Sequence, residues 1–263
     1  MIQLIDTHAH LYVEQFDEDR ELMLQRAYDA GVQKIFLPNI DSRYIDSLCQ
    51  LSQEYPERCF PMMGVHPCSI KSDYQTELDG AYWALKENPT LFAAIGEIGL
   101  DFYWDLTHKS EQIEALKTQI NWAKEFDLPI VLHCRESFNE TFEIVQSMND
   151  EKLRGIFHCF TGSTEDAQKV IGLNDFYMGI GGVITYKNSK ELSETIKNTS
   201  LKYFVLETDA PYLVPHTYRK KKHKRNESAF IVAVAEKIAE LKETSVEEVA
   251  AMTTENALQI FYN

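Results

Sequence analysis

Short apolar runs alternate along the chain with longer stretches whose apolar residues recur at helical spacing. Eight runs show this character. They are the segments 3–10, 34–40, 59–67, 91–100, 129–137, 155–163, 176–184 and 203–211. Each spacing from one run to the next is about that of a unit of one strand and one helix.

The stretches between and after these runs carry helix signals. The clearest helical patterns lie at 17–32, 110–128, 163–173, 226–243 and 245–263. In 17–32 the apolar set is Leu22, Leu24, Ala27 and Val32, and Gly31 stands where a helix commonly ends. In 110–128 one stripe comprises Ile113, Leu116, Ile120 and Ala123, and the segment 163–173 opens with a Ser-Thr-Glu-Asp capping cluster.

Strands that alternate with helices predict a parallel sheet. Eight such units in 263 residues predict a closed (β/α)₈ TIM barrel that forms one domain over residues 1–263. A doubly wound open sheet is the alternative. Because no GxGxxG motif follows the first run, the pattern does not favour a dinucleotide-binding version of that alternative.

Composition and charge limit the class of protein and the cellular compartment that we expect. No run approaches the ~18 apolar residues of a membrane helix, and no basic segment followed by an apolar one marks a signal peptide. Five cysteines without a CxxC pair argue against a disulfide framework or a zinc–thiolate site, so we expect a cytoplasmic protein. The net charge of −15 repels nucleic acid at long range, unless bound cations reverse the sign locally.

Histidines and carboxylates gather where the apolar runs end. The residues at these ends are His8, His10, His66, Glu97, His133, His158, Glu207 and Asp209, whereas the other three histidines lie in polar stretches. Each buried imidazole would need its own polar partner if these histidines were independent core residues. In a barrel these strand ends meet at one rim, so a shared divalent cation is the simpler explanation.

Strand alternation gives a second expectation about these side chains. His8 and His10 share parity with Asp6, so we expect the two imidazoles to point together into the barrel mouth. Glu207 and Asp209 are also two positions apart, so alternation places their side chains on one face of the strand. Cys134 and Cys159 directly follow His133 and His158, so alternation predicts that both thiols point toward the helices as packing groups.

Imidazole nitrogens combined with carboxylate oxygens suit zinc, manganese, iron or nickel better than calcium. Four histidines and two carboxylates exceed the usual three protein ligands of a single catalytic site. Two metals bridged by one carboxylate fit such a set better, and would supply a metal-activated hydroxide near neutral pH.

Six motifs, in order, resemble those of TatD-family metal-dependent hydrolases. They are DTHAHL, GVHP, GEIGLDFY, HCRES, HCFTGS and LETDAPYL, which cover nearly the whole chain from Ile5 onward. DxHxH alone would indicate only the wider amidohydrolase superfamily. The resemblance implies a TIM barrel with one or two divalent metal ions (magnesium, manganese, zinc, nickel or iron) and a magnesium- or manganese-dependent DNase, often a 3′→5′ exonuclease.

The resemblance also assigns roles to single positions. His8 and His10 match the family's first pair of metal ligands, Glu97 its bridging carboxylate, and His133 and His158 the ligands of the fifth and sixth strands. Asp209 matches the ligand after the last strand, which would also position or deprotonate the attacking water. His66 resembles a residue that faces the scissile phosphate, where it would stabilise charge or donate a proton.

Three further positions have two interpretations each. Glu207 could fix the orientation of a ligand, and Arg135 could hold a phosphate through its planar fork. Either could equally belong to a structural ion pair. Asp101 lies in the barrel mouth or caps a buried turn.

One stretch departs from the family pattern. Where the family has a short loop with Arg-Gly and then Asn-Glu-Pro, this chain reads HTYRKKKHKRNESAF, which is longer, has no glycine, and has Ser228 in place of the proline. The basic cluster comprises Arg219, Lys220, Lys221, Lys222, Lys224 and Arg225. It is either a contact to the phosphate backbone or a solvated loop.

The leading hypothesis is therefore a metal-dependent deoxyribonuclease whose partner is a DNA substrate. We expect a monomer with no obligate protein partner and no membrane contact. The first alternative is hydrolysis of a small amide, ester or lactone by the same centre. A nucleic-acid-binding module with a merely structural metal is the second alternative, and the scarcity of aromatic residues in the basic cluster argues against it.

Overall fold

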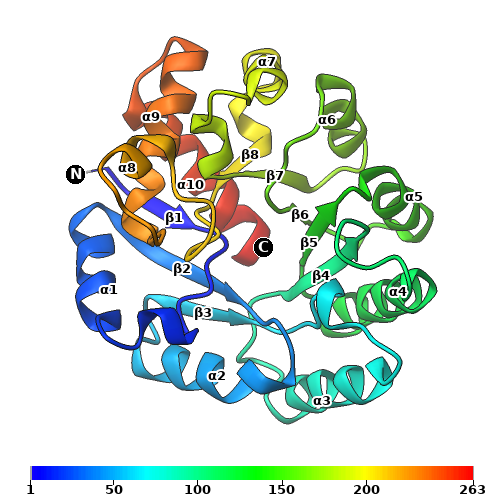
Figure 1. The fold of residues 1–263 in the computed structure, drawn as a ribbon. Coiled ribbons are helices and arrows are strands. Elements are labelled where there is room, and N and C mark those ends of the chain that lie inside the picture. Colours follow the sequence, from blue (N-terminus) through cyan, green and yellow to red (C-terminus); the bar gives the residue numbers. More distant parts are fainter. Residues whose placement is uncertain (1, 263) are drawn as a thin grey trace.

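A computed structural model describes residues 2–262, and Figure 1 shows its strands as a ring surrounded by helices. The chain alternates between strand and helix along most of its length. The strands are β1 (Leu4–Asp6), β2 (Val32–Pro38), β3 (Cys59–Met62), β4 (Ile95–Asp101), β5 (Ile130–Arg135), β6 (Gly155–Phe157), β7 (Phe176–Ile180) and β8 (Phe204–Leu206).

The strands pair in sequence order, and every paired ladder is parallel. Between β3 and β4 the contact is a backbone hydrogen bond from Met63 N to Ala94 O, at 3.0 Å. The ring closes where β1 meets β8, because Thr7 N donates to Leu206 O at 3.0 Å and Ala9 bridges Ala210. The predicted (β/α)₈ barrel is thus confirmed over the described residues.

One apolar cluster fills the interior of the barrel. It takes one residue from each strand, or from just before it at β4, and these are Ile5, Phe36, Met62, Ala94, Val131, Ile156, Tyr177 and Val205. Ala257, Ile260 and Phe261 of the last helix join the same cluster, so this helix closes the end of the barrel opposite the strands' carboxyl ends. A larger cluster packs the outer faces of the strands against the helices.

The helices form the outer layer (Figure 1). They are α1 (Arg20–Asp29), α2 (Ile45–Glu54), α3 (Tyr74–Glu87), α4 (Lys109–Phe126), α5 (Phe138–Met148), α6 (Thr164–Ile171), α7 (Lys190–Asn198), α8 (His216–Lys220), α9 (Ile231–Lys242) and α10 (Val246–Tyr262). The predicted cap of α6 is present as a capping box between Ser163 and Asp166. No helix among residues 2–262 is long and apolar enough to cross a membrane.

The start of the chain differs in detail from the sequence pattern. Gly31 follows α1 with φ +97°, as expected for a residue after a helix, and a side chain there would collide with Ile2 O. Leu22, however, is exposed, and the buried face of α1 consists of Met23, Leu24 and Ala27. The expected apolar set of this helix was therefore wrong at Leu22, and Val32 begins β2 instead of ending the helix.

Candidate metal centre

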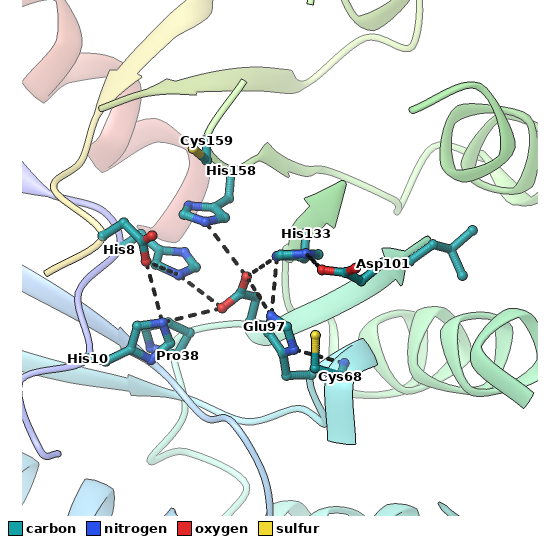
Figure 2. Close-up of polar contacts among 12 residues, drawn as sticks. His8, His10, Pro38, Cys68, Glu97, Asp101, His133, His158 and Cys159 are labelled. Atoms are coloured by element: carbon teal, nitrogen blue, oxygen red, sulfur yellow. Dashed lines mark hydrogen bonds and ion pairs between the residues drawn. The ribbon is translucent and has the colours of Figure 1, made fainter. Parts of the chain in front are cut away.

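Glu97 stands in the middle of a cluster of imidazoles at the carboxyl ends of the strands (Figure 2). Its Oε2 atom lies 3.1 Å from His8 Nε2 and 3.4 Å from His10 Nε2. Asp209 Oδ1 completes this half of the cluster, at 3.8 Å from His8 Nε2 and 3.6 Å from His10 Nε2. Two nitrogens and two carboxylate oxygens thus face one another across a few ångströms.

The other carboxylate oxygen of Glu97 faces a second group of imidazoles. Its Oε1 atom lies 2.8 Å from His133 Nδ1, 3.4 Å from His66 Nε2 and 3.7 Å from His158 Nε2. The two halves touch, because the rings of His158 and His8 stack with their centroids 3.4 Å apart. Glu97 is therefore shared by two sets of nitrogen donors, with one oxygen toward each set.

The alternation of β1 does not explain how its histidines reach this cluster. Ile5 belongs to the barrel interior, so the side chain of Asp6 points out of the barrel, where Oδ2 accepts a hydrogen bond of 2.6 Å from Thr208 Oγ1. His8 and His10 both enter the cluster as expected, but the shared face with Asp6 from which this was argued does not exist. Because β1 ends at Asp6, the two histidines lie in the loop that follows it, which is bonded to β8.

A local irregularity also positions Glu97. The ladder between β4 and β5 shifts register between Ile95 and Ile98, whereas the pairing from Ile98 onward is regular. On β5 and β6 simple alternation holds. Val131 and Ile156 face the interior, and two positions later His133 and His158 enter the cluster.

A hydrogen bond outside the cluster fixes the proton of His10. His10 Nδ1 lies 3.0 Å from the hydroxyl of Tyr12, which itself donates to Pro38 O at 2.5 Å. Since the only proton of the Tyr12 hydroxyl goes to Pro38, its oxygen accepts from His10 Nδ1–H. The Nε2 atom of His10 then keeps its lone pair, which points toward Glu97 and Asp209.

His66 carries its ring proton on the nitrogen opposite to that of His10. Its Nδ1 atom accepts a hydrogen bond of 3.0 Å from the backbone N–H of Cys68, so the proton of the neutral ring is on Nε2. That N–H points toward Glu97 Oε1 and His133 Nδ1. His66 is therefore a hydrogen-bond donor to the cluster, which makes it a poor metal ligand.

Asp101 fulfils both interpretations of its position. Its Oδ2 atom lies 2.9 Å from His133 Nε2, which leaves the Nδ1 lone pair of His133 on the side of Glu97. Its Oδ1 atom accepts hydrogen bonds of 3.0 Å from the backbone N–H groups of Tyr103 and Trp104. One buried carboxylate thus holds a member of the cluster and caps the turn after β4.

Glu207 lies behind His158. Its Oε1 atom is 3.0 Å from His158 Nδ1 and accepts a hydrogen bond of 2.6 Å from Cys159 N. This geometry favours an orienting role over a structural ion pair. Cys134 packs against the helix-side core as expected, but Cys159 has φ +47° and its Sγ atom lies within 4.8 Å of the His158 and Glu207 ligand atoms. The expectation for Cys159 was wrong because β6 ends at Phe157.

Burial and the close approach of charged groups shift the pKa values of several cluster residues. Burial raises the pKa of Asp209 to about 6, against the opposing effect of His158 and His10. Burial alone would lower the pKa of His158, but the charges of Glu207 and Glu97 raise it to about 10. Burial would likewise raise the pKa of Glu97, yet the surrounding imidazoles hold it well below its usual range.

In the described part of the chain, Glu97 and Asp209, the two central carboxylates, have no lysine or arginine to balance their charge. Within residues 2–262, no lysine or arginine lies within 4.0 Å of Glu97 or Asp209, whose ion-pair contacts are all to histidines. Buried carboxylates without positive partners are costly, and nitrogen and oxygen donors together suit divalent transition metals. The donor set therefore fits divalent metal ions.

The cluster opens to solvent on one side. The side chains of His66, His133 and Asp209 are 14%, 17% and 15% exposed, whereas the other members are almost fully buried. A cavity of about 310 Å³ lies beside His158 and Cys159, between the loops that follow β5 and β6. A substrate would therefore approach from the side of these three residues.

Comparison with known proteins agrees with this geometry. The family model described as TatD related DNase matches residues 5–262. The chain belongs to the TatD-related DNase family. It is 40% identical to the uncharacterized metal-dependent hydrolase YabD of Bacillus subtilis, over 98% of each chain. It is 32% identical to the 3′-5′ ssDNA/RNA exonuclease TatD of Salmonella typhimurium, again over 98% of each chain.

A solved structure confirms the barrel of this TatD-family chain. The crystal structure of YjjV, a TatD homologue from Escherichia coli, superposes with a TM-score of 0.91 at 29% identity and covers 99% of this chain and 98% of its own. All six residues expected as metal ligands converge in the TatD-family chain: His8, His10, Glu97, His133, His158 and Asp209. His66 and Glu207 lie directly beside them.

Within residues 2–262, none of Arg219, Lys220 and Arg225 forms an ion pair with a carboxylate of the cluster in this TatD-family chain. Arg219 and Lys220 end the short helix α8, where Arg219 donates to the Tyr186 hydroxyl at 2.8 Å and Lys220 is exposed. Arg225 forms a two-point ion pair with Asp19, at 2.7 and 2.9 Å, so its geometry is that of a structural ion pair. The predicted phosphate contacts of these residues stay predictions, and the geometry of Arg225 does not support one.

Sequence reasoning missed Tyr12 and the backbone N–H of Cys68. Tyr12 has a visible signal, since it stands two residues after His10 at the end of the first motif. The N–H of Cys68 has none, because any residue after Pro67 would offer the same donor. That contact arises from the 3₁₀ turn Pro67–Ser69, in which His66 is the capping residue.

Proposed function

We propose that this protein is a metal-dependent nuclease that hydrolyses phosphodiester bonds of DNA. His8, His10, Asp209 and the Oε2 atom of Glu97 would hold one divalent cation. His133, His158 and the Oε1 atom of Glu97 would hold the other. The observation that carries the proposal is the shared carboxylate of Glu97 between two sets of donors, the arrangement expected of a two-metal site for phosphoryl transfer.

The relatives support the choice of substrate. The Salmonella relative is named a 3′-5′ ssDNA/RNA exonuclease and matches along the whole chain. The same name recurs for other relatives at about this level of similarity. A 3′→5′ direction of hydrolysis is therefore part of the proposal.

When bound, the cations would lower the pKa of the attacking water and offset negative charge on the phosphate. Asp209 is the carboxylate on the open side of the centre, 15% exposed against 3% for Glu97, so it can reach an incoming water. Asp209 takes the proton of that water as it attacks phosphorus.

His66 acts on the phosphate from the same open side. Because Cys68 occupies its Nδ1 atom, His66 donates through Nε2–H. This donor would turn from Glu97 and His133 to a phosphate oxygen once cations occupy those two residues. This donor stabilises the charge that builds up in the transition state, or passes its proton to the leaving oxygen. Glu207 holds His158 from behind and makes no contact with substrate in this scheme.

The net charge of −15 opposes the approach of DNA, so local cations matter. Arg135 is exposed and ends β5 two residues after His133. We infer that Arg135 contacts the phosphate backbone next to the centre. Arg219 and Lys220 would contact it farther along, from α8.

The test combines metal analysis of the purified protein with digestion of 5′-labelled single-stranded DNA. We expect loss of cleavage on chelation and its return with manganese or magnesium. Glu97→Ala and His133→Ala should each lower the rate by at least about a hundredfold while circular dichroism stays native. His108→Ala is the matched control, because this ring bonds to Asp105 instead of the centre.

A panel of small esters, amides and lactones decides between the proposal and its alternative. The same donors could activate a water against a carbonyl group. Turnover of one of these compounds, without any hydrolysis of single-stranded, nicked or duplex DNA, would replace the nuclease assignment. Near-normal DNA hydrolysis by both Glu97→Ala and His133→Ala would refute the site itself.

A further inference from the structure

Two large aromatic side chains project into solvent directly after β4. Trp104 is 67% exposed and Tyr103 is 50% exposed, although both belong to types that normally bury most of their surface. Their rings meet edge-on, with centroids 4.8 Å apart and an angle of 85° between the planes. Adjacent exposed aromatic side chains are a feature of binding surfaces.

Arg135 joins this pair from the end of β5. Its guanidinium carbon lies 3.9 Å from the centroid of the Tyr103 ring and 5.2 Å from that of Trp104. Within residues 2–262 no carboxylate lies within ion-pair distance of this guanidinium, whereas Arg26, Arg43, Arg154 and Arg225 all have such partners. Arg135 is thus held by aromatic rings and keeps its hydrogen-bond donors for a ligand.

The group is tied to the metal centre through one side chain. Asp101 bonds to His133 with one oxygen and to the backbone of Tyr103 and Trp104 with the other. His133 is one of the three residues on the open side of the cluster. The aromatic pair is therefore at the edge of the opening through which a substrate reaches the centre.

We propose that Tyr103, Trp104 and Arg135 form a subsite for one unpaired nucleobase and its phosphate, next to the phosphate that is cleaved. This inference rests on the proposed nuclease function and adds the residues that select single strands. Proteins bind single strands by stacking bases on aromatic rings beside cationic groups, and bases inside a duplex are not available for such stacking. The aromatic residues that the basic cluster at 219–225 lacks are present here instead.

Tryptophan fluorescence gives a direct test of stacking. The chain has three tryptophans, and Trp122 is buried. Titration of the metal-loaded protein with a phosphorothioate oligothymidylate, whose linkages resist hydrolysis, should quench emission. Trp104→Ala should lose this quenching, and Trp83→Ala should keep it, because Trp83 is equally exposed at 66% but lies on α3.

Kinetics with a modified substrate give a second test. Replacing Trp104 by alanine should raise KM for a single-stranded oligonucleotide by about tenfold, within the range of one lost stacking contact. In wild type, an abasic residue at one position near the cleaved end should raise KM by a similar factor. In Trp104→Ala the abasic residue should have no further effect, since the base and the ring act together.

The outcomes separate this subsite from the nuclease proposal. If oligonucleotides are digested but Trp104→Ala and Tyr103→Ala match Trp83→Ala in KM and quenching, the subsite is wrong and the nuclease proposal stands. If neither digestion nor quenching occurs with any nucleic acid, both are wrong. Concentration-dependent dimers that vanish in Trp104→Ala, with no change in KM, would make these rings a contact between two copies and overturn the subsite.

Discussion

His8 Nε2 lies 3.8 Å from Asp209 Oδ1, although the two residues are 201 positions apart in the sequence. The backbone brings them together, because Asp209 N donates to His8 O at 2.9 Å where β1 meets β8. The same seam includes the bridge between Ala9 and Ala210. A cation held by His8 and Asp209 would therefore connect the first and last strands of the barrel.

Removal of metal should lower the thermal stability of the protein. A cation at ~100 times its Kd stabilises the folded state by about 2.7 kcal/mol, which corresponds to roughly 5–10 °C in Tm for a domain of this size. Scanning calorimetry with and without a chelator measures the shift, and Asp209→Asn should show a smaller one. An unchanged Tm after metal analysis proves removal would contradict the prediction.

Glu207→Gln should weaken metal binding without unfolding the protein. The amide can still accept from Cys159 N, but it removes the charge that orients His158. Loss of such a supporting carboxylate typically costs about 10–100-fold in metal affinity. Calorimetric titration of the metal-free protein measures the effect. Glu227→Gln is the control, since Glu227 is also buried but pairs with Arg26 outside the centre.

The convergence of the six ligand positions could be predicted because it depends on topology. In a parallel barrel all strands end at the same rim, so polar residues at the ends of apolar runs must meet. Eight such runs were visible in the sequence, and the motifs of a known family named the positions. Naming these six candidate ligands therefore needed no knowledge of local backbone conformation.

The local geometry could not be predicted, because it depends on contacts between strands. Alternation fails at His8, since β1 ends early and its loop bonds to β8. It fails again at Cys159, where the backbone has φ +47° and its N–H donates to Glu207. The Nε2–H of His66 follows from a backbone donor at Cys68, which any residue type would provide.

Gly179→Ala should damage both the fold and the centre. A side chain at this buried position of β7 would place its Cβ 2.2 Å from Glu207 Oε2. Either β7 or Glu207 must move, so we expect a loss of about 1–3 kcal/mol in the free energy of unfolding together with weaker metal binding. Urea denaturation measures the first effect and metal titration the second.

Gly80→Ala is the matched control for that substitution. Gly80 lies within α3, and no atom is found within 4 Å of a Cβ added there. Alanine in a helix interior should stabilise the protein by about 0.5–1 kcal/mol. Equal stability of the Gly179→Ala variant and wild type would show that Glu207 can move aside without cost, and would contradict the prediction.

The ion pair of Asp19 and Arg225 should make a pH-dependent contribution to stability. Hydrogen bonds from Arg225, and more weakly from Arg26, outweigh partial burial and lower the pKa of Asp19 from 3.8 to about 2. Because the folded state has the lower pKa, the stabilisation is complete above pH 3.8 and disappears as pH falls through 2.

Asp19→Asn should therefore cost about 1 kcal/mol at pH 6, a value typical of partly exposed ion pairs. The difference in free energy of unfolding between wild type and variant should shrink as pH is lowered from 4 toward 2, as measured by urea denaturation. Arg225→Ala should show a pH dependence of the same sign. If Arg225→Ala left stability unchanged and raised only KM for DNA, Arg225 would be a substrate contact, as the sequence alone had suggested.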